Sequence, residues 1–178
     1  HPWAMEDRPI IDPAARPGRA AATRTSGRFE TLSRVDASDG WDLPEDHRAE
    51  RTEVREERAR SALNWVRSPD LPFDRSINPY RGCEHGCIYC FARPTHAYLG
   101  LSPGLDFETR LVARPGIADV LETELRAPRY SVAPLAIGTN TDPYQPVEKR
   151  YALMRDILGV LDRFHHPVAI FSKVSFFL

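Results

Sequence analysis

The second half of the chain alternates between short continuous apolar runs and apolar stripes that repeat every three or four positions. Residues 133–137 and 167–171 are continuous runs, typical of strands buried on both faces of a parallel sheet. Residues 110–113 predict a further short strand. Helical stripes occupy residues 116–126 and the segment that begins at Pro146. This alternation of strand and helix favours an α/β fold with a parallel sheet.

Each predicted helix has one apolar face. The face of the first helix comprises Ile117, Val120, Leu121 and Leu125. The second helix begins at Pro146, because a proline in the first turn loses no hydrogen bond there. Its buried face comprises Val147, Tyr151, Met154, Ile157, Leu158 and Leu161.

The middle of the chain predicts a strand, a loop and a short helix. Residues 76–81 would form the first strand of the domain and deliver the following loop from its C-terminal end, where active sites of parallel α/β barrels lie. Residues 91–100 predict a short helix. Residues 101–109 contain Pro103 and Gly104 and predict an irregular lid.

The N-terminal part carries little periodicity. Residues 1–50 mix Pro, Ala, Arg, Gly and Asp, which predicts a largely disordered extension. Residues 51–66 carry a partial helical stripe but also suit an extended lead-in, and both interpretations stay open. We therefore expect a mostly irregular extension over residues 1–69 and a folded domain over residues 70–178. Because the apolar end of the chain follows directly on a predicted strand, we expect a truncated domain.

Charge and hydropathy exclude several classes of protein. The 178 residues include 24 basic and 25 acidic side chains, for a net charge of −1. Nucleic acid stays open as a partner, but this balance gives no electrostatic argument for it, since nucleic-acid binding usually requires a basic face. No apolar run approaches the length of a bilayer span, so we expect no membrane partner. The start of the chain lacks the pattern of a signal peptide, and we expect a cytoplasmic location.

All three cysteines lie within eight residues, as Cys83, Cys87 and Cys90. The spacing Cys-x3-Cys-x2-Cys allows three thiolates to converge on one metal centre, and thiolates are preferred ligands of iron–sulfur clusters and of zinc. A [4Fe–4S] cluster held by three cysteines keeps one iron open to another ligand. Gly82 and Gly86 suit such a loop, because glycine lets the backbone bend tightly around sulfur.

Two other interpretations of the cysteines stay open. Together with His85 or His96 they would form a Cys3His zinc site, which indicates a zinc-stabilised interaction domain. Alternatively, the loop would hold an iron–sulfur cluster in a non-catalytic redox module.

The cysteine loop resembles the signature of radical S-adenosylmethionine (radical SAM) enzymes, Cys-x3-Cys-x-aromatic-Cys, with Tyr89 as the aromatic residue. The wider block from residue 76 to residue 110 and a second block at residues 138–148 resemble the branch related to spore photoproduct lyase, often labelled DNA repair photolyase-like. The resemblance covers about residues 70–173. It implies a [4Fe–4S] cluster on the three cysteines, S-adenosyl-L-methionine on the open iron, and Tyr89 against the adenine.

The resemblance also implies further cofactor contacts at two strand ends. In radical SAM proteins the position of residues 138–142 often receives the amino group of the methionine moiety, which makes Asn140, Thr141 and Asp142 candidates. Capping or turn formation before Pro143 explains these polar residues equally well. Ser172 and Lys173 resemble a polar–lysine pair of the relatives, where the lysine approaches the cofactor carboxylate.

The fold implied by the resemblance is an incomplete (β/α) barrel, of which this chain would hold about the first half. The implied function is that of a radical SAM enzyme, lyase-like in type, which cleaves S-adenosylmethionine reductively to a 5′-deoxyadenosyl radical. It would require an electron donor such as flavodoxin or ferredoxin. Spore photoproduct lyase uses a further cysteine as hydrogen donor, and this chain has no fourth cysteine. The substrate therefore stays unknown, and we expect half a barrel to be incomplete for turnover.

Overall fold

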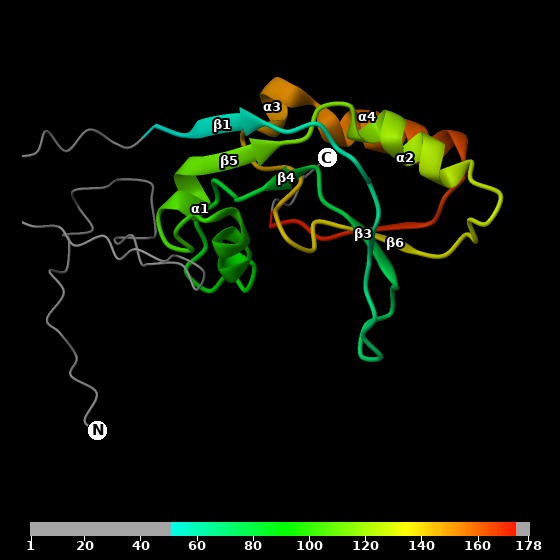
Figure 1. Ribbon diagram of the computed structural model, residues 1–178, viewed down its shortest axis with the longest axis horizontal. Coiled ribbons are helices and arrows are strands. Elements are labelled where there is room, and N and C mark those ends of the chain that lie inside the picture. Colours follow the sequence, from blue (N-terminus) through cyan, green and yellow to red (C-terminus); the bar gives the residue numbers. More distant parts are fainter. Residues whose placement is uncertain (1–50, 174–178) are drawn as a thin grey trace, which may run out of the picture.

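The computed structural model describes residues 51–173, which form two small sheets and a pair of packed helices (Figure 1). The first sheet has the order β1 (Glu53–Glu56), β5 (Arg110–Ala113) and β4 (Tyr80–Arg81). The second has the order β2 (Asn64–Trp65), β3 (Arg75–Ile77), β6 (Leu135–Ile137) and β7 (Val168–Ile170). Neither sheet closes into a barrel within the described residues.

The second sheet contains the predicted parallel strands. β3 pairs in parallel with β6, and β6 pairs in parallel with β7, with Ile77 opposite Ile137 and Ile137 opposite Ile170. The C-terminal ends of all three strands therefore meet at one edge of the sheet. This edge carries the predicted cofactor residues that follow β6 and β7.

Two helices cover one face of the parallel strands. α2 (Ile117–Leu125) and α4 (Leu153–Arg163) lie side by side above β3 and β6 (Figure 1). The predicted faces are confirmed for most residues, although Val120, Tyr151 and Leu158 are only partly buried. The core between the helices and the strands comprises Ile77, Ile117, Leu121, Leu135, Ile137, Met154, Ile157 and Leu161.

The helix predicted from Pro146 onward is two helices. α3 (Glu148–Tyr151) ends at Ala152, whose φ of 52° breaks the helical path before α4 begins. The break lets the Glu148 carboxylate accept a hydrogen bond from the backbone N–H of Met154 at 2.8 Å. An acidic side chain thus satisfies a free N–H group in the first turn of α4, a stabilising arrangement at a helix N-terminus.

The strand predicted over residues 76–81 is divided between the two sheets. The chain leaves the second sheet after β3, passes through Asn78 and Pro79, and joins the first sheet as β4, antiparallel to β5. Pro79 has no N–H to donate to a ladder, which favours the change of partner at this point. The cysteine loop therefore begins beside β5 rather than directly at the end of the parallel strands.

The predicted lid over residues 101–109 is instead a buried turn. The short helix predicted before it is a 3-10 helix, η2 (Arg93–Leu99), and α1 (Asp106–Thr109) follows. All four residues of α1 are buried. Glu108 pairs with the Arg93 guanidinium at 2.5 Å, which compensates the charge of the buried carboxylate. The prediction of a lid is wrong, because this segment packs beneath the cysteine loop.

The segment before residue 70 takes part in the fold. β1 pairs in parallel with β5, and β2 pairs with β3. Ala59, Ala62 and Leu63 are buried. The extended interpretation of residues 51–66 is therefore the one observed, and the folded part begins upstream of the expected boundary at residue 70. The predicted extension over residues 1–50 lies outside the described residues.

The last strand is exposed, although a buried strand was predicted. Val168 and Ile170 in β7 retain 39% and 40% of their accessible surface. β7 pairs only with β6 among the described strands, so it forms the edge of the second sheet. Within residues 51–173, no helix is long and apolar enough to cross a membrane.

Candidate cysteine-lined site

The cysteine loop is anchored by its glycine. Gly82 has a φ of 78°, and a Cβ atom there would lie 2.7 Å from the Leu111 side chain and 2.9 Å from the Phe107 carbonyl oxygen. The Gly82 carbonyl accepts hydrogen bonds from Thr141 Oγ1 at 2.6 Å and from Gln145 Nε2 at 3.2 Å. These contacts hold the start of the loop against the segment that follows β6.

The three cysteines line a single cavity of about 240 Å³. The loop after β6 and the end of β7 supply the opposite wall. The polar residues on that wall are Thr139, Asn140, Thr141, Asp142, Ser172 and Lys173, and His85 lines the cavity beside the cysteines. The structure thus brings together all three predicted metal ligands and five of the six predicted cofactor residues. The parallel strands β6 and β7 place the cofactor residues at one edge, and the contacts of Gly82 with Thr141 and Gln145 hold the cysteine loop against them.

Tyr89 is the predicted cofactor residue that does not line the cavity. Its side chain is 79% exposed, and the neighbouring Ile88 and Phe91 are also exposed. Exposure alone does not separate Tyr89 from the cavity, because the equally exposed Phe91 lines it.

Cys83 is the most enclosed of the cysteines, with 7% of its surface exposed. Burial raises the pKa of the Cys83 thiol to about 11, although hydrogen bonds from the backbone N–H groups of His85 and Asp142 act in the opposite direction. Backbone N–H groups directed at a sulfur also stabilise a metal-bound thiolate. The site therefore carries donors for an anionic sulfur even though the metal-free thiol is protonated at neutral pH.

In the metal-free chain we expect Cys83 to react slowly with iodoacetamide. Only the thiolate reacts, so a pKa near 11 should slow alkylation at pH 8 by roughly a hundredfold relative to an ordinary cysteine. The rate should rise with pH until the pKa is reached. Mass spectrometry of a labelling time course measures this rate, and the same chain in urea is the control. Equal rates in the folded and unfolded chain would contradict the prediction.

Lys173 faces the cysteines from the end of β7. A hydrogen bond to the Cys87 sulfur is the main cause that raises the pKa of Lys173, and the charges of Cys87 and Tyr89 add to it. The ammonium group is therefore held at the cavity, opposite the metal-binding loop. It provides a positive charge that a carboxylate ligand in the cavity would pair with.

Asp142 holds the ends of β6 and β7 together. Its carboxylate accepts hydrogen bonds from the Lys173 backbone N–H at 2.6 Å, from Ser172 Oγ at 3.0 Å and from the Tyr144 backbone N–H at 2.9 Å. The hydrogen bond from the Tyr144 backbone N–H closes a local turn, which is the alternative to a cofactor role that the sequence left open for Asp142. Thr141 is likewise engaged with Gly82. These side chains therefore shape the cavity, and the turn interpretation describes their observed contacts.

Replacing Asp142 with Ala should lower the free energy of unfolding by about 2 kcal/mol, because it removes the acceptor for three donors. Urea unfolding measures the loss, and Asp162→Ala, at an exposed position of α4, is the matched control. Amide exchange at Lys173 should accelerate in the Asp142 variant. An unchanged exchange rate would show that Asp142 does not hold the end of β7.

The three thiols are candidate ligands for an iron–sulfur cluster or for zinc. Among the described residues, no three His, Cys, Asp or Glu side chains are grouped as ligands of a single metal ion. His85 Nε2 lies 3.6 Å from Asp142 Oδ2. His96 is buried and lies 2.9 Å from the Arg110 carbonyl oxygen, away from the cysteine-lined cavity. Three thiols around one cavity, with N–H groups directed at sulfur, match the ligation of such clusters.

Several residues that support the site were not predicted. Arg93 Nε donates to the Cys87 carbonyl at 3.0 Å, and Gln145 Oε1 accepts from the Glu84 backbone N–H at 3.0 Å. The Asn78 side chain bonds to Thr139 and to the backbone of Asn140. The available signal was their position: each lies in a block that carries the family resemblance.

Comparisons with known proteins give relatives without an assigned function. The chain is 51% identical over 115 residues to uncharacterized proteins of Mycobacterium tuberculosis and Mycobacterium bovis, covering 64% of this chain and 34% of theirs. It is 24% identical over 106 residues to an uncharacterized protein of Methanocaldococcus jannaschii, covering 60% of this chain and 37% of that protein. The chain thus spans about a third of the length of the curated relatives it matches. No family model and no solved structure matches.

Proposed function

We propose that the chain is part of a radical SAM enzyme in which Cys83, Cys87 and Cys90 bind a [4Fe–4S] cluster and S-adenosylmethionine binds in the same cavity. The observation that carries this proposal is the shared cavity: the three cysteines face the polar residues at the ends of β6 and β7. The spacing of the cysteines and the resemblance of the flanking blocks support it.

The residues of the cavity divide into those that would contact the cofactor and those that hold the walls. The Lys173 ammonium would pair with the carboxylate of S-adenosylmethionine, and Asn140 would contact its polar groups from the end of β6. Thr141, Asp142 and Ser172 hydrogen-bond within the walls and would orient these two residues. Tyr89 would stack its exposed ring on the adenine outside the cavity.

When bound, the cluster and the cofactor supply one-electron chemistry, the cleavage of S-adenosylmethionine and hydrogen abstraction from an unreactive C–H bond. The chain contributes ligation, orientation of the cofactor and a buried environment around Cys83. The cluster requires a low-potential electron donor such as flavodoxin or ferredoxin. The substrate of the whole protein is not specified by these residues.

Anaerobic reconstitution with iron and sulfide tests the proposal. We expect a brown protein whose reduced cluster gives an electron paramagnetic resonance spectrum that changes when S-adenosylmethionine is added. A cluster that does not respond to S-adenosylmethionine would overturn the proposal in favour of a non-catalytic redox module. A colourless protein that retains zinc would overturn it in favour of a zinc-stabilised interaction domain.

A further inference from the structure

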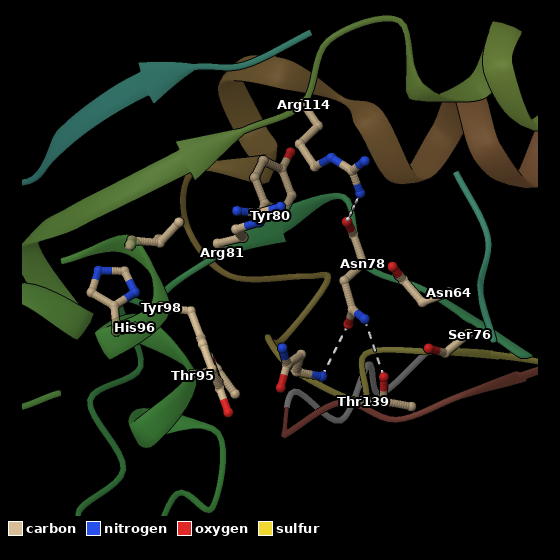
Figure 2. Close-up of a pocket in the computed structure, with 12 residues that line it drawn as sticks. Asn64, Ser76, Asn78, Tyr80, Arg81, Thr95, His96, Tyr98, Arg114 and Thr139 are labelled. Atoms are coloured by element: carbon tan, nitrogen blue, oxygen red, sulfur yellow. Dashed lines mark hydrogen bonds between the residues drawn. The ribbon is translucent and has the colours of Figure 1, made fainter. Parts of the chain in front are cut away.

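A second, larger cavity adjoins the cysteine-lined one. It has a volume of about 470 Å³ and shares Thr139 and Asn140 with its neighbour. This volume is in the range of small-molecule sites. Figure 2 shows the Asn78 side chain directed toward Thr139, so these residues form the boundary between the two cavities.

The lining of this second cavity is mixed, with polar and apolar side chains, and it carries two guanidinium groups. Arg81, at the end of β4, and Arg114, directly after β5, both line it. The Arg81 guanidinium is partly exposed and lies 3.7 Å from Glu57 Oε1. Asn64, Ser76 and Thr95 add neutral polar groups.

Arg114 is a buried cation without a close counter-ion. It is 8% exposed, and among the described residues no carboxylate lies within ion-pair distance of its guanidinium. Its terminal nitrogens donate to the Ser61 carbonyl at 2.6 Å and to the Asn78 carbonyl at 3.4 Å. Its Nε atom is buried and has no hydrogen-bond partner within residues 51–173. Figure 2 shows this side chain extending toward Asn78 at the upper side of the cavity.

The charges around Arg114 do not compensate its burial. Burial and the like charge of Arg81 lower the pKa of Arg114, and the more distant Glu57 and Glu124 act against this shift. The Glu124 carboxylate already accepts hydrogen bonds from the backbone N–H groups of Ala62 and Leu63. A guanidinium stays protonated even when buried, so its charge remains to be neutralised. An unpaired buried charge is strongly unfavourable.

We propose that this second cavity binds a small molecule bearing a phosphate or carboxylate group, held by Arg114 and Arg81 next to the cysteine-lined cavity. Both groups are oxoanions that a guanidinium binds through charge-assisted hydrogen bonds, and the Arg114 and Arg81 side chains both line this cavity. The shared wall at Thr139 and Asn140 would direct the rest of the molecule toward the cysteines. That this molecule is a substrate rests on the function proposed above. That the cavity binds an anion does not depend on that function.

Titration of the metal-free, full 178-residue chain at low ionic strength tests the proposal, with inorganic phosphate and acetate as separate probes. Isothermal calorimetry should detect saturable binding of at least one anion, and the tighter of the two identifies the group. Arg114→Met should weaken binding at least about tenfold, since it removes charged hydrogen-bond donors. Arg155→Gln, at an exposed position of α4, should leave the affinity unchanged.

Further variants keep each outcome decisive. If Arg114→Met does not fold, Arg81→Gln replaces it. The Arg81 side chain is partly exposed, so this substitution should weaken binding with little loss of stability. Absence of saturable binding to the original chain would overturn the proposal, as would equal weakening by the Arg81 and Arg155 variants. A triple Cys83→Ser, Cys87→Ser, Cys90→Ser variant should still bind the anion. A chain that binds the anion but assembles no cluster would refute only the proposed function. A chain that assembles the cluster but does not bind the anion would refute only this inference.

Discussion

Replacing Cys83, Cys87 or Cys90 with Ala should abolish the brown chromophore that forms on anaerobic reconstitution with iron and sulfide. Each thiol lines the same cavity, and the sequence contains no other cysteine that could take the place of a lost ligand. Cluster ligation by cysteine requires a thiolate at each position. Absorbance spectra together with iron and sulfide analysis measure the loss, which should be nearly complete for each single variant.

His85→Ala is the matched control for the cysteine variants. His85 lines the same cavity and would be the fourth ligand of a zinc site, but it has no part in a cluster held by three cysteines. The His85 variant should therefore keep its iron, sulfide and colour. A variant with all three cysteines replaced by Ala that still binds stoichiometric iron and sulfide would refute the assignment of the ligands.

Gly138→Ala should lower the free energy of unfolding by about 3 kcal/mol or more. Gly138 has a φ of 86°, and a Cβ atom there would lie 2.2 Å from the Phe171 carbonyl oxygen and 2.9 Å from Pro143 Cδ. The backbone of β7 would have to move away from the end of β6, since neither contact involves a flexible side chain. Urea unfolding monitored by circular dichroism measures the loss.

Gly100→Ala is the control for Gly138→Ala, because it adds the strain of a left-handed backbone without the steric clash expected at Gly138. Gly100 has a φ of 69°, but a Cβ atom there would meet no atom within 4 Å. It should therefore cost only the conformational strain of about 1–2 kcal/mol. Equal losses for the two variants would show that the ends of β6 and β7 are not held in close contact.

Much of the fold could be predicted because it depends on local pattern. The apolar runs that contain β6 and β7, and the stripe that forms α2, are properties of a few consecutive residues and do not depend on the rest of the chain. The meeting of the ends of β6 and β7 could also be predicted, because parallel strands place their C-terminal ends together.

Other features depended on residues far apart in the chain. The partial helical pattern of residues 51–66 did not show that residues 53–56 form a strand beside β5, because that pairing requires a partner almost sixty positions away. The change of sheet at Asn78 and Pro79 required β5 as an alternative partner for β4. The burial of α1 resulted from packing of Phe107 and Glu108 against the cysteine loop, although its Pro- and Gly-rich approach indicated an irregular lid.

The sequence by itself determined the number and spacing of the thiols, the parallel strands and the helix faces, since each follows from neighbouring residues. Only the tertiary structure decided what surrounds the thiols. It enclosed Cys83, exposed Tyr89, and assigned Asp142 to three hydrogen bonds within the wall of the cavity. It also buried Arg114 with no close counter-ion in the part of the chain that the structure describes. Burial and pairing of polar groups are set by residues that meet only on folding, so no pattern along the chain contains them.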